Sequence, residues 1–60
     1  MTLLERRLDK GLTQVEVAKY AGVDQSQISM YEAGAYKPKT MAAVRMAELY
    51  GCTIEEIMEG

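Results

Sequence analysis

Residues 13–34 read TQVEVAKYAGVDQSQISMYEAG, and this stretch decides the fold. Thr13 can cap the start of a helix, and Glu16, three residues later, can close a capping box with it. Gly22 stands where that helix must stop and the chain must turn sharply, a step that often needs a positive φ. Asp24 then opens a second helix directly after the turn. The stretch therefore predicts two short helices joined by a tight glycine turn.

The second helix carries the same start signal as the first. Gln27 follows Asp24 by three residues, in the place of the reciprocal capping partner. Ala18 and Ala21 keep the first helix slim, so the second helix can cross it closely. Two short helices arranged in this way form a helix-turn-helix motif, which can place its second helix in the major groove of DNA.

Capping residues and glycines divide the rest of the chain as well. Thr2 with Glu5 predicts a first helix that stops at Gly11. The expected helices span residues 2–10, 13–21, 24–33 and 40–50, with a loop at 34–39 and a short fifth helix opened by Thr53 with Glu56 and frayed at Gly60. No strand-like alternation occurs. The sequence therefore predicts one all-α domain over residues 1–60, a compact bundle of five helices.

Apolar residues recur at helical spacing in each segment and indicate which faces are buried. In the fourth segment, for example, Ala43, Met46, Ala47 and Tyr50 follow the i, i+3, i+4, i+7 pattern. The other expected buried sets are Leu4, Leu8 and Leu12; Val17, Ala18 and Ala21; Ile28 and Tyr31; and Ile54, Ile57 and Met58.

Composition excludes several classes of protein. The chain has no histidine and a single cysteine, Cys52, so it can form neither an intramolecular disulfide nor a Cys/His zinc site. With no histidine and one cysteine, the chain has few side chains suited to acid–base or nucleophilic catalysis. We therefore expect that it is not an enzyme and that it binds no cofactor and no metal. A small fold without such links fits the reducing cytoplasm. Charges interrupt the apolar residues of the N-terminal segment, which therefore predicts neither a signal peptide nor a membrane span.

Net charge is −2, with a pI near 4.9, whereas DNA-binding proteins usually carry a basic face. The charges are segregated along the chain, however. All seven Lys and Arg residues precede the C-terminal segment, where Glu55, Glu56 and Glu59 gather. A mildly acidic chain of this kind can still present one basic face.

The ordered set of motifs resembles the five-helix DNA-binding domain of phage repressors and Cro proteins, the XRE-like family of small transcriptional regulators. The resemblance spans nearly all of the chain. It rests on GLTQ at 11–14, Ala18, GV at 22–23, IS at 28–29, YEAG at 31–34, KP at 37–38, MAELYG at 46–51 and TIEEIM at 53–58.

This resemblance implies that residues Gln25 to Glu32 form the recognition helix, which lies in the major groove of double-stranded DNA. Gln25 is the best candidate for a base contact, because its amide can pair with adenine N6 and N7. The other implied base contacts are Ser26, Ser29 and Met30, and the implied phosphate contacts are Gln14, Lys37 and Lys39. The simpler alternative to DNA contact is that these side chains are polar only because they lie on a solvated surface. For Gln27, the simpler alternative is that it serves only as a capping partner of the helix.

Family positions also suggest an ion pair between Arg7 and Glu32, to which we assign a structural role. Three residues depart from the family pattern. Arg6 stands where leucine is common, so we expect Leu8 to take over its packing; Met30 replaces a long polar side chain and offers at most a thymine-methyl contact; and Lys39 takes the usual Ser/Thr capping place.

Proteins of this type usually act as dimers on two half-sites of a palindrome. We expect a weak homodimer through Ile54, Ile57 and Met58, because so small a core cannot cover all three. The alternative function is a helical protein-interaction module that has lost DNA binding, which the acidic pI and Met30 both favour.

Overall fold

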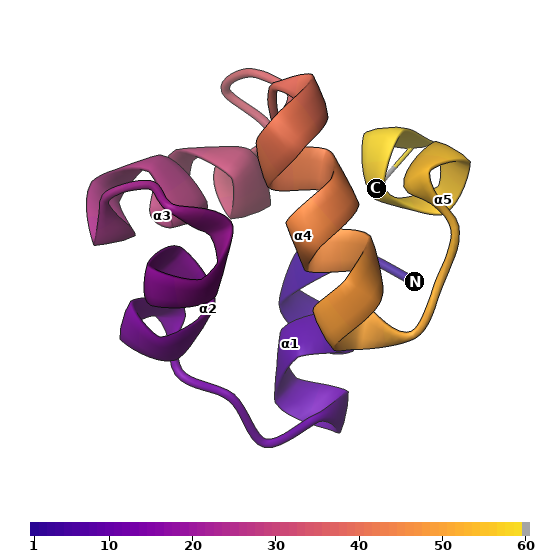
Figure 1. The fold of residues 1–60 in the computed structure, drawn as a ribbon, viewed down its shortest axis with the longest axis horizontal. Helices are drawn as coiled ribbons and strands as arrows, with labels where there is room; N and C mark the ends of the chain where they lie inside the picture. The colour runs from indigo at the N-terminus through magenta and orange to yellow at the C-terminus, as the bar shows by residue number, and fades with distance from the viewer. Residues whose placement is uncertain (60) are drawn as a thin grey trace.

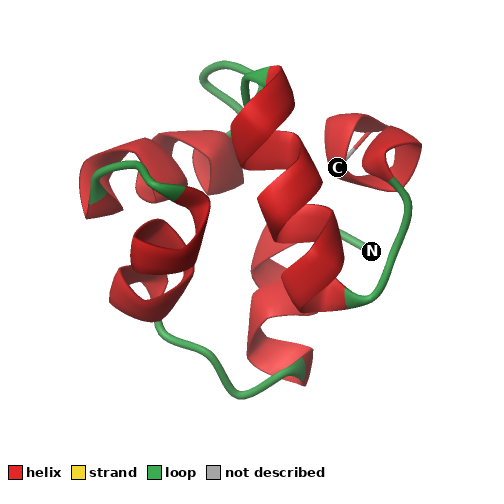
Figure 2. Ribbon diagram, viewed as in Figure 1, coloured by secondary structure: helices red, strands yellow, loops and turns green. Residues whose placement is uncertain are grey.

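A computed structural model describes residues 1–59 of the chain, and over these residues it contains five α-helices and no strand. The helices are α1 (Leu3–Asp9), α2 (Gln14–Ala21), α3 (Gln25–Ala33), α4 (Thr40–Tyr50) and α5 (Ile54–Glu59). In Figure 1, α4 crosses the centre of the molecule, α2 and α3 lie to one side of it and α5 to the other. Loops join the helices throughout, as Figure 2 shows. The predicted helices are confirmed, and the predicted fraying at Gly60 lies outside the described residues.

Local capping explains where the helices begin. The backbone N–H of Glu16 donates to Thr13 Oγ1 at 3.1 Å, and the N–H of Thr13 donates to the Glu16 carboxylate at 2.8 Å. The same reciprocal pair forms between Thr2 and Glu5. It forms again at Thr53, whose backbone hydrogen bond lowers the pKa of Glu56. Each of these predicted capping boxes is confirmed.

The core is built from residues of all five helices, most of them aliphatic, together with two tyrosines. Val17, Ile28 and Met46 have no exposed surface. The predicted buried faces of α2, α3 and α4 are confirmed, since all nine of their predicted residues belong to the buried cluster, which consists of Leu3, Val17, Ala18, Ala21, Ile28, Tyr31, Ala42, Ala43, Met46, Ala47, Tyr50 and Ile57. α2 packs against both α3 and α4, so the helix pair formed by α2 and α3 is held on α4 through α2.

The predicted buried set of the first helix and its exit is wrong for Leu4 and Leu8, whereas Leu12 packs against the core. Leu3 is buried, whereas Leu8 is 61% exposed and Leu4 is also exposed. Leu3 and Arg7 lie four residues apart and so share one face of the helix, and this is the face turned toward the interior. Leu8 also does not fill the place in the core that a leucine at position 6 would occupy, although the sequence predicted that it would. The Arg6 side chain is itself 14% exposed and pairs with Glu56 on α5.

The last helix also differs from the prediction. Ile57 is 1% exposed and belongs to the core, Met58 packs against the core, and only Ile54 is clearly exposed. The proposed dimer surface of three aliphatic residues is therefore corrected, because Ile57 already has its partners within the chain.

Candidate nucleic-acid interface

The turn between α2 and α3 sets the angle at which α3 is presented. Gly22 adopts φ +75° and ψ +31°, a left-handed conformation that residues with a Cβ rarely adopt. Its N–H donates to the Ala18 carbonyl at 2.9 Å, which closes α2. α3 begins only three residues later and leaves α2 at a steep angle, as Figure 1 shows. The predicted turn at Gly22 is confirmed.

One face of α3 is buried and the other is free. Ile28 and Tyr31 face the core, while Gln25, Ser26 and Ser29 are exposed. Met30 is also exposed, at 45% of its surface. The four residues predicted to contact bases therefore all lie on the accessible surface of this helix.

Gln27 has a different role from its neighbours. Its side-chain oxygen accepts the backbone N–H of Asp24 at 3.0 Å, and the side chain is partly buried. Gln27 is therefore a capping residue of α3, as its simpler reading predicted.

An ion pair links α1 to α3 beneath this surface. Arg7 Nε donates to Glu32 Oε2 at 2.6 Å and Arg7 Nη2 to Glu32 Oε1 at 3.3 Å, while Arg7 Nη1 donates to the Leu12 carbonyl at 2.9 Å. The two side chains are only 12% and 7% exposed. Hydrogen bonding to Glu32 raises the pKa of Arg7. The predicted pair is confirmed, with the two-bond geometry that a guanidinium and a carboxylate allow.

The ion pair extends to the surface through two glutamines. Gln14 Nε2, at the start of α2, donates to Glu32 Oε1 at 2.9 Å. Gln14 Oε1 in turn accepts from Gln25 Nε2 at 3.3 Å. Arg7, Glu32, Gln14 and Gln25 thus form one continuous chain of hydrogen bonds, from the interface of α1 and α3 to the exposed start of α3.

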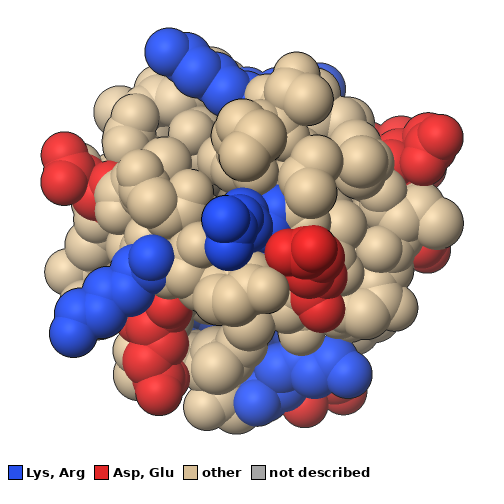
Figure 3. All heavy atoms as spheres, in the orientation of Figure 1, with Lys and Arg blue, Asp and Glu red and all other residues tan. Residues whose placement is uncertain are grey.

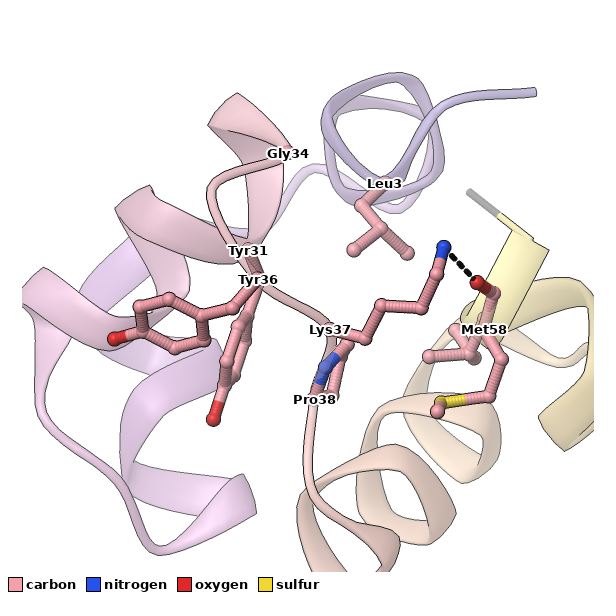
Figure 4. A pocket seen from close by; sticks show the side chains of 8 residues that line it. Leu3, Tyr31, Gly34, Tyr36, Lys37, Pro38 and Met58 are labelled. Atoms are coloured by element: carbon pink, nitrogen blue, oxygen red, sulfur yellow. Dashed lines mark hydrogen bonds between the residues drawn. The ribbon is translucent and has the colours of Figure 1, made fainter.

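Lys37 does not project from the loop as its predicted role requires. Its ammonium group donates to the Met58 carbonyl near the end of α5, as Figure 4 shows. In the same view, Lys37 and Met58 lie across a small pocket whose other lining residues include Leu3, Tyr36 and Pro38. A phosphate contact by Lys37 would require this hydrogen bond to break.

Lys39 is the positively charged residue at the N-terminus of α4. It occupies the N-cap position, is exposed, and makes no side-chain capping bond. The first N–H groups of an uncapped helix attract anions, because they lack intrahelical partners and carry the positive end of the helix dipole. The predicted displacement of the usual Ser/Thr cap by Lys39 is confirmed.

Charges do not form a broad basic patch on the side of the molecule seen in Figure 3. Blue and red side chains are interspersed there, and acidic ones lie at the edge occupied by α5 in Figure 1. Arg6 and Arg7 are each engaged by a glutamate. Arg45 lies over the ring of Tyr20, 5.5 Å from its centroid. On this side of the molecule, therefore, a nucleic acid would meet individual positioned groups and no large positive field.

The geometry of α2, Gly22 and α3 agrees with comparisons to known proteins. A family model described as "Helix-turn-helix" matches residues 3–57. The chain belongs to this helix-turn-helix family.

Two curated relatives of the helix-turn-helix chain support this assignment. It is 39% identical over 49 residues to the "Uncharacterized HTH-type transcriptional regulator YqaF" of Bacillus subtilis (strain 168), covering 82% of this chain and 64% of that protein. It is 36% identical over 53 residues to an "Uncharacterized HTH-type transcriptional regulator" of Archaeoglobus fulgidus, covering 88% of this chain and 76% of that protein. The chain thus spans less than two thirds of the length of the Bacillus relative. No solved structure gives a significant match.

Residues 1–59 of the helix-turn-helix chain include no helix with the length and apolarity needed to span a bilayer.

The sequence did not predict the hydrogen bonds that connect the side chains of this site. It assigned Arg7 and Glu32 a purely structural role and Gln14 a separate phosphate contact, whereas the structure connects all three to Gln25. A signal was present in the sequence. Gln14 and Gln25 each occupy the first position of their helix, and the first turns of α2 and α3 are brought together by the tight turn.

Proposed function

We propose that this chain is a sequence-specific double-stranded DNA-binding regulator of transcription in the cytoplasm, and that its residues 1–60 form one helix-turn-helix domain. The observation that carries the proposal is the exposed row of Gln25, Ser26, Ser29 and Met30 on a helix held at a fixed angle by Gly22. An exposed helix of this kind fits the major groove, whose base edges differ for each base pair. The names of the two relatives support the same function.

We assign the principal base contact to Gln25. Its Nε2 is held by Gln14, and its carbonyl oxygen is left for a ligand. A glutamine amide can accept from adenine N6 and donate to adenine N7 at the same time. Ser26 and Ser29 offer shorter contacts nearby, and Met30 offers an apolar contact for a thymine methyl group.

We assign the phosphate contacts to Lys39 at the start of α4 and to Gln14 at the start of α2. Gln14 has a second N–H beyond the one that it donates to Glu32. Both residues stand at helix N-termini, where backbone N–H groups favour an anion. Lys37 is a weaker candidate because its ammonium group is bonded to Met58.

Selection of duplexes from a random DNA pool tests this function. We expect an enriched palindrome, because one α3 helix reads too few base pairs to discriminate well and two copies must bind together. Gln25→Ala is expected to weaken binding to the selected duplex by about 1–3 kcal/mol, and to weaken binding to random DNA much less. Equal weakening on both would show that Gln25 contacts only the backbone.

Two further variants serve as controls. Gln27→Ala removes a glutamine two residues away whose oxygen caps α3, so it should lower the melting temperature and leave the base preference unchanged. Lys39→Ala should weaken binding to all duplexes alike and reduce the slope of log affinity against log salt by about 1. Absence of binding to any duplex at low salt would instead favour a protein-interaction module.

A further inference from the structure

The start of α2 lies against a group that can accept hydrogen bonds but cannot donate them. Glu32 is 7% exposed, and its oxygens take bonds from Arg7 Nε at 2.6 Å and Gln14 Nε2 at 2.9 Å. A carboxylate beside an arginine has no proton to donate. Gln14 must therefore turn its NH₂ group to Glu32, and its carbonyl oxygen must point the other way.

The orientation of the Gln14 amide determines which group of Gln25 can bond to it. Gln14 Oε1 accepts from Gln25 Nε2 at 3.3 Å, so one N–H of Gln25 is already used. What Gln25 can offer a ligand is its other N–H together with its carbonyl oxygen. That pair matches adenine, which presents the acceptor N7 beside the donor N6. Guanine presents two acceptors, N7 and O6, and pairing with both would need both N–H groups.

We propose that Glu32, acting through Gln14, fixes the direction of the Gln25 amide and so makes α3 prefer adenine to guanine. The inference rests on the proposed function, since it concerns which base Gln25 reads. Glu32 and Gln14 are positioning residues in this scheme, because the base contact belongs to Gln25. The ion pair of α1 and α3 then contributes to specificity as well as to the stability of the fold.

The experiment first locates the base pair that Gln25 reads. Random-pool selection with the wild-type chain and with Gln25→Ala identifies the position whose adenine preference depends on this residue. Competition binding then compares two duplexes that differ only there, one with A·T and one with G·C. The wild type should favour adenine about fivefold or more, the range expected of one good bidentate contact.

Glu32→Gln is the decisive variant. Its amide can donate as well as accept, so the direction of the Gln14 amide is no longer determined. Gln25 is then free to offer both N–H groups, and the adenine-to-guanine ratio should fall to about twofold or less. Gln14→Met interrupts the chain without touching the ion pair and should lower the ratio in the same way. It also provides the test if Glu32→Gln does not fold.

Arg7→Gln is the matched control. It removes the other half of the ion pair but leaves the Glu32 carboxylate to orient Gln14, so the ratio should remain that of the wild type. Circular dichroism at the assay temperature verifies that each variant is folded. A base preference is the informative measurement, because a loss of stability alone would weaken binding to both duplexes equally.

The outcomes separate this inference from the proposed function. An unchanged ratio in folded Glu32→Gln overturns the positioning role of Glu32 while the base contact stands. An unchanged ratio in Gln14→Met overturns it as well, since the proposed route passes through Gln14. Loss of the ratio in Arg7→Gln as well would show general distortion of α3 and also overturns it. If the wild type selects no adenine that depends on Gln25, the base contact of the proposed function fails, and the inference fails with it.

Discussion

At the scale of single residues, Tyr50 is the most unusual member of the core. Its side chain is buried at the end of α4, and its hydroxyl group finds no hydrogen-bond partner among the described residues. Burial, and after it the negative charge of Glu32, raises the pKa of Tyr50 to about 12. A buried hydroxyl group without a partner is a source of instability, because folding removes it from water without replacing its hydrogen bonds.

Tyr50→Phe should therefore be neutral or stabilising at neutral pH. An unfolded tyrosine titrates near pH 10, so the folded chain holds this proton more tightly between pH 10 and about 12. Within that window the unfolded state binds fewer protons, and the free energy of unfolding of the wild type should fall as pH rises, by about 2 kcal/mol in all. Urea denaturation of both proteins at pH 8 to 12 measures this. Below pH 10 the difference between them should be constant, and a difference that stayed constant up to pH 12 would contradict the prediction.

At the scale of the elements, two ion pairs tie α1 to other helices in different environments. Arg7 pairs with Glu32 on α3, and both side chains are nearly buried. Arg6 pairs with Glu56 on α5 at 3.3 Å, but the Glu56 side chain is 46% exposed. Removing one member of a buried pair strands the other charge away from water, whereas an exposed pair is weakened by solvent and salt.

Double-mutant cycles with alanine should separate the two pairs. We expect a coupling energy above about 1 kcal/mol for Arg7 and Glu32, and below about 0.5 kcal/mol for Arg6 and Glu56. Chemical denaturation of the single and double variants gives both values, and the exposed pair is the internal control for the loss of a charge from α1. A coupling below about 0.3 kcal/mol for Arg7 and Glu32 would reduce it to two independent charges.

At the scale of the whole molecule, α5 divides its apolar residues between the core and the surface. Ile57 is buried with Leu3 in one cluster, while Ile54 is 42% exposed on the same short helix. A charge at position 57 would enter the core without a partner, and a charge at position 54 would remain in water. A homodimer formed through α5 would therefore depend on Ile54 and not on Ile57.

Ile57→Asp should unfold the chain or lower its stability by more than about 3 kcal/mol, whereas Ile54→Asp should leave helicity and stability nearly unchanged. Circular dichroism and thermal melting of the two variants measure this difference. If the proposed weak dimer uses α5, Ile54→Asp should also abolish cooperative binding to a palindrome and keep the affinity for a single half-site. Unchanged cooperativity in Ile54→Asp would place the dimer contact elsewhere.

Much of this architecture follows from the sequence alone because it depends on near neighbours. A capping box joins residues three positions apart, so Thr13 with Glu16 and Thr53 with Glu56 could be recognised without any knowledge of the fold. The glycine turn at Gly22 is equally local. The buried face of α4 could also be predicted, since eleven residues are long enough to show a helical period.

The packing of α1, the burial of Ile57 and the partners of the site were decided only by the tertiary structure. α1 has seven residues, and its leucines are compatible with more than one buried face, so only its packing into the common core determined that Leu3 faces inward. The hydrogen bonds that build the site join residues far apart in sequence: Arg7 to Glu32 across 25 positions, Gln14 to Glu32 across 18, and Lys37 to Met58 across 21. Such contacts have no local signature, because they depend on the direction in which each side chain leaves its helix once the helices have packed.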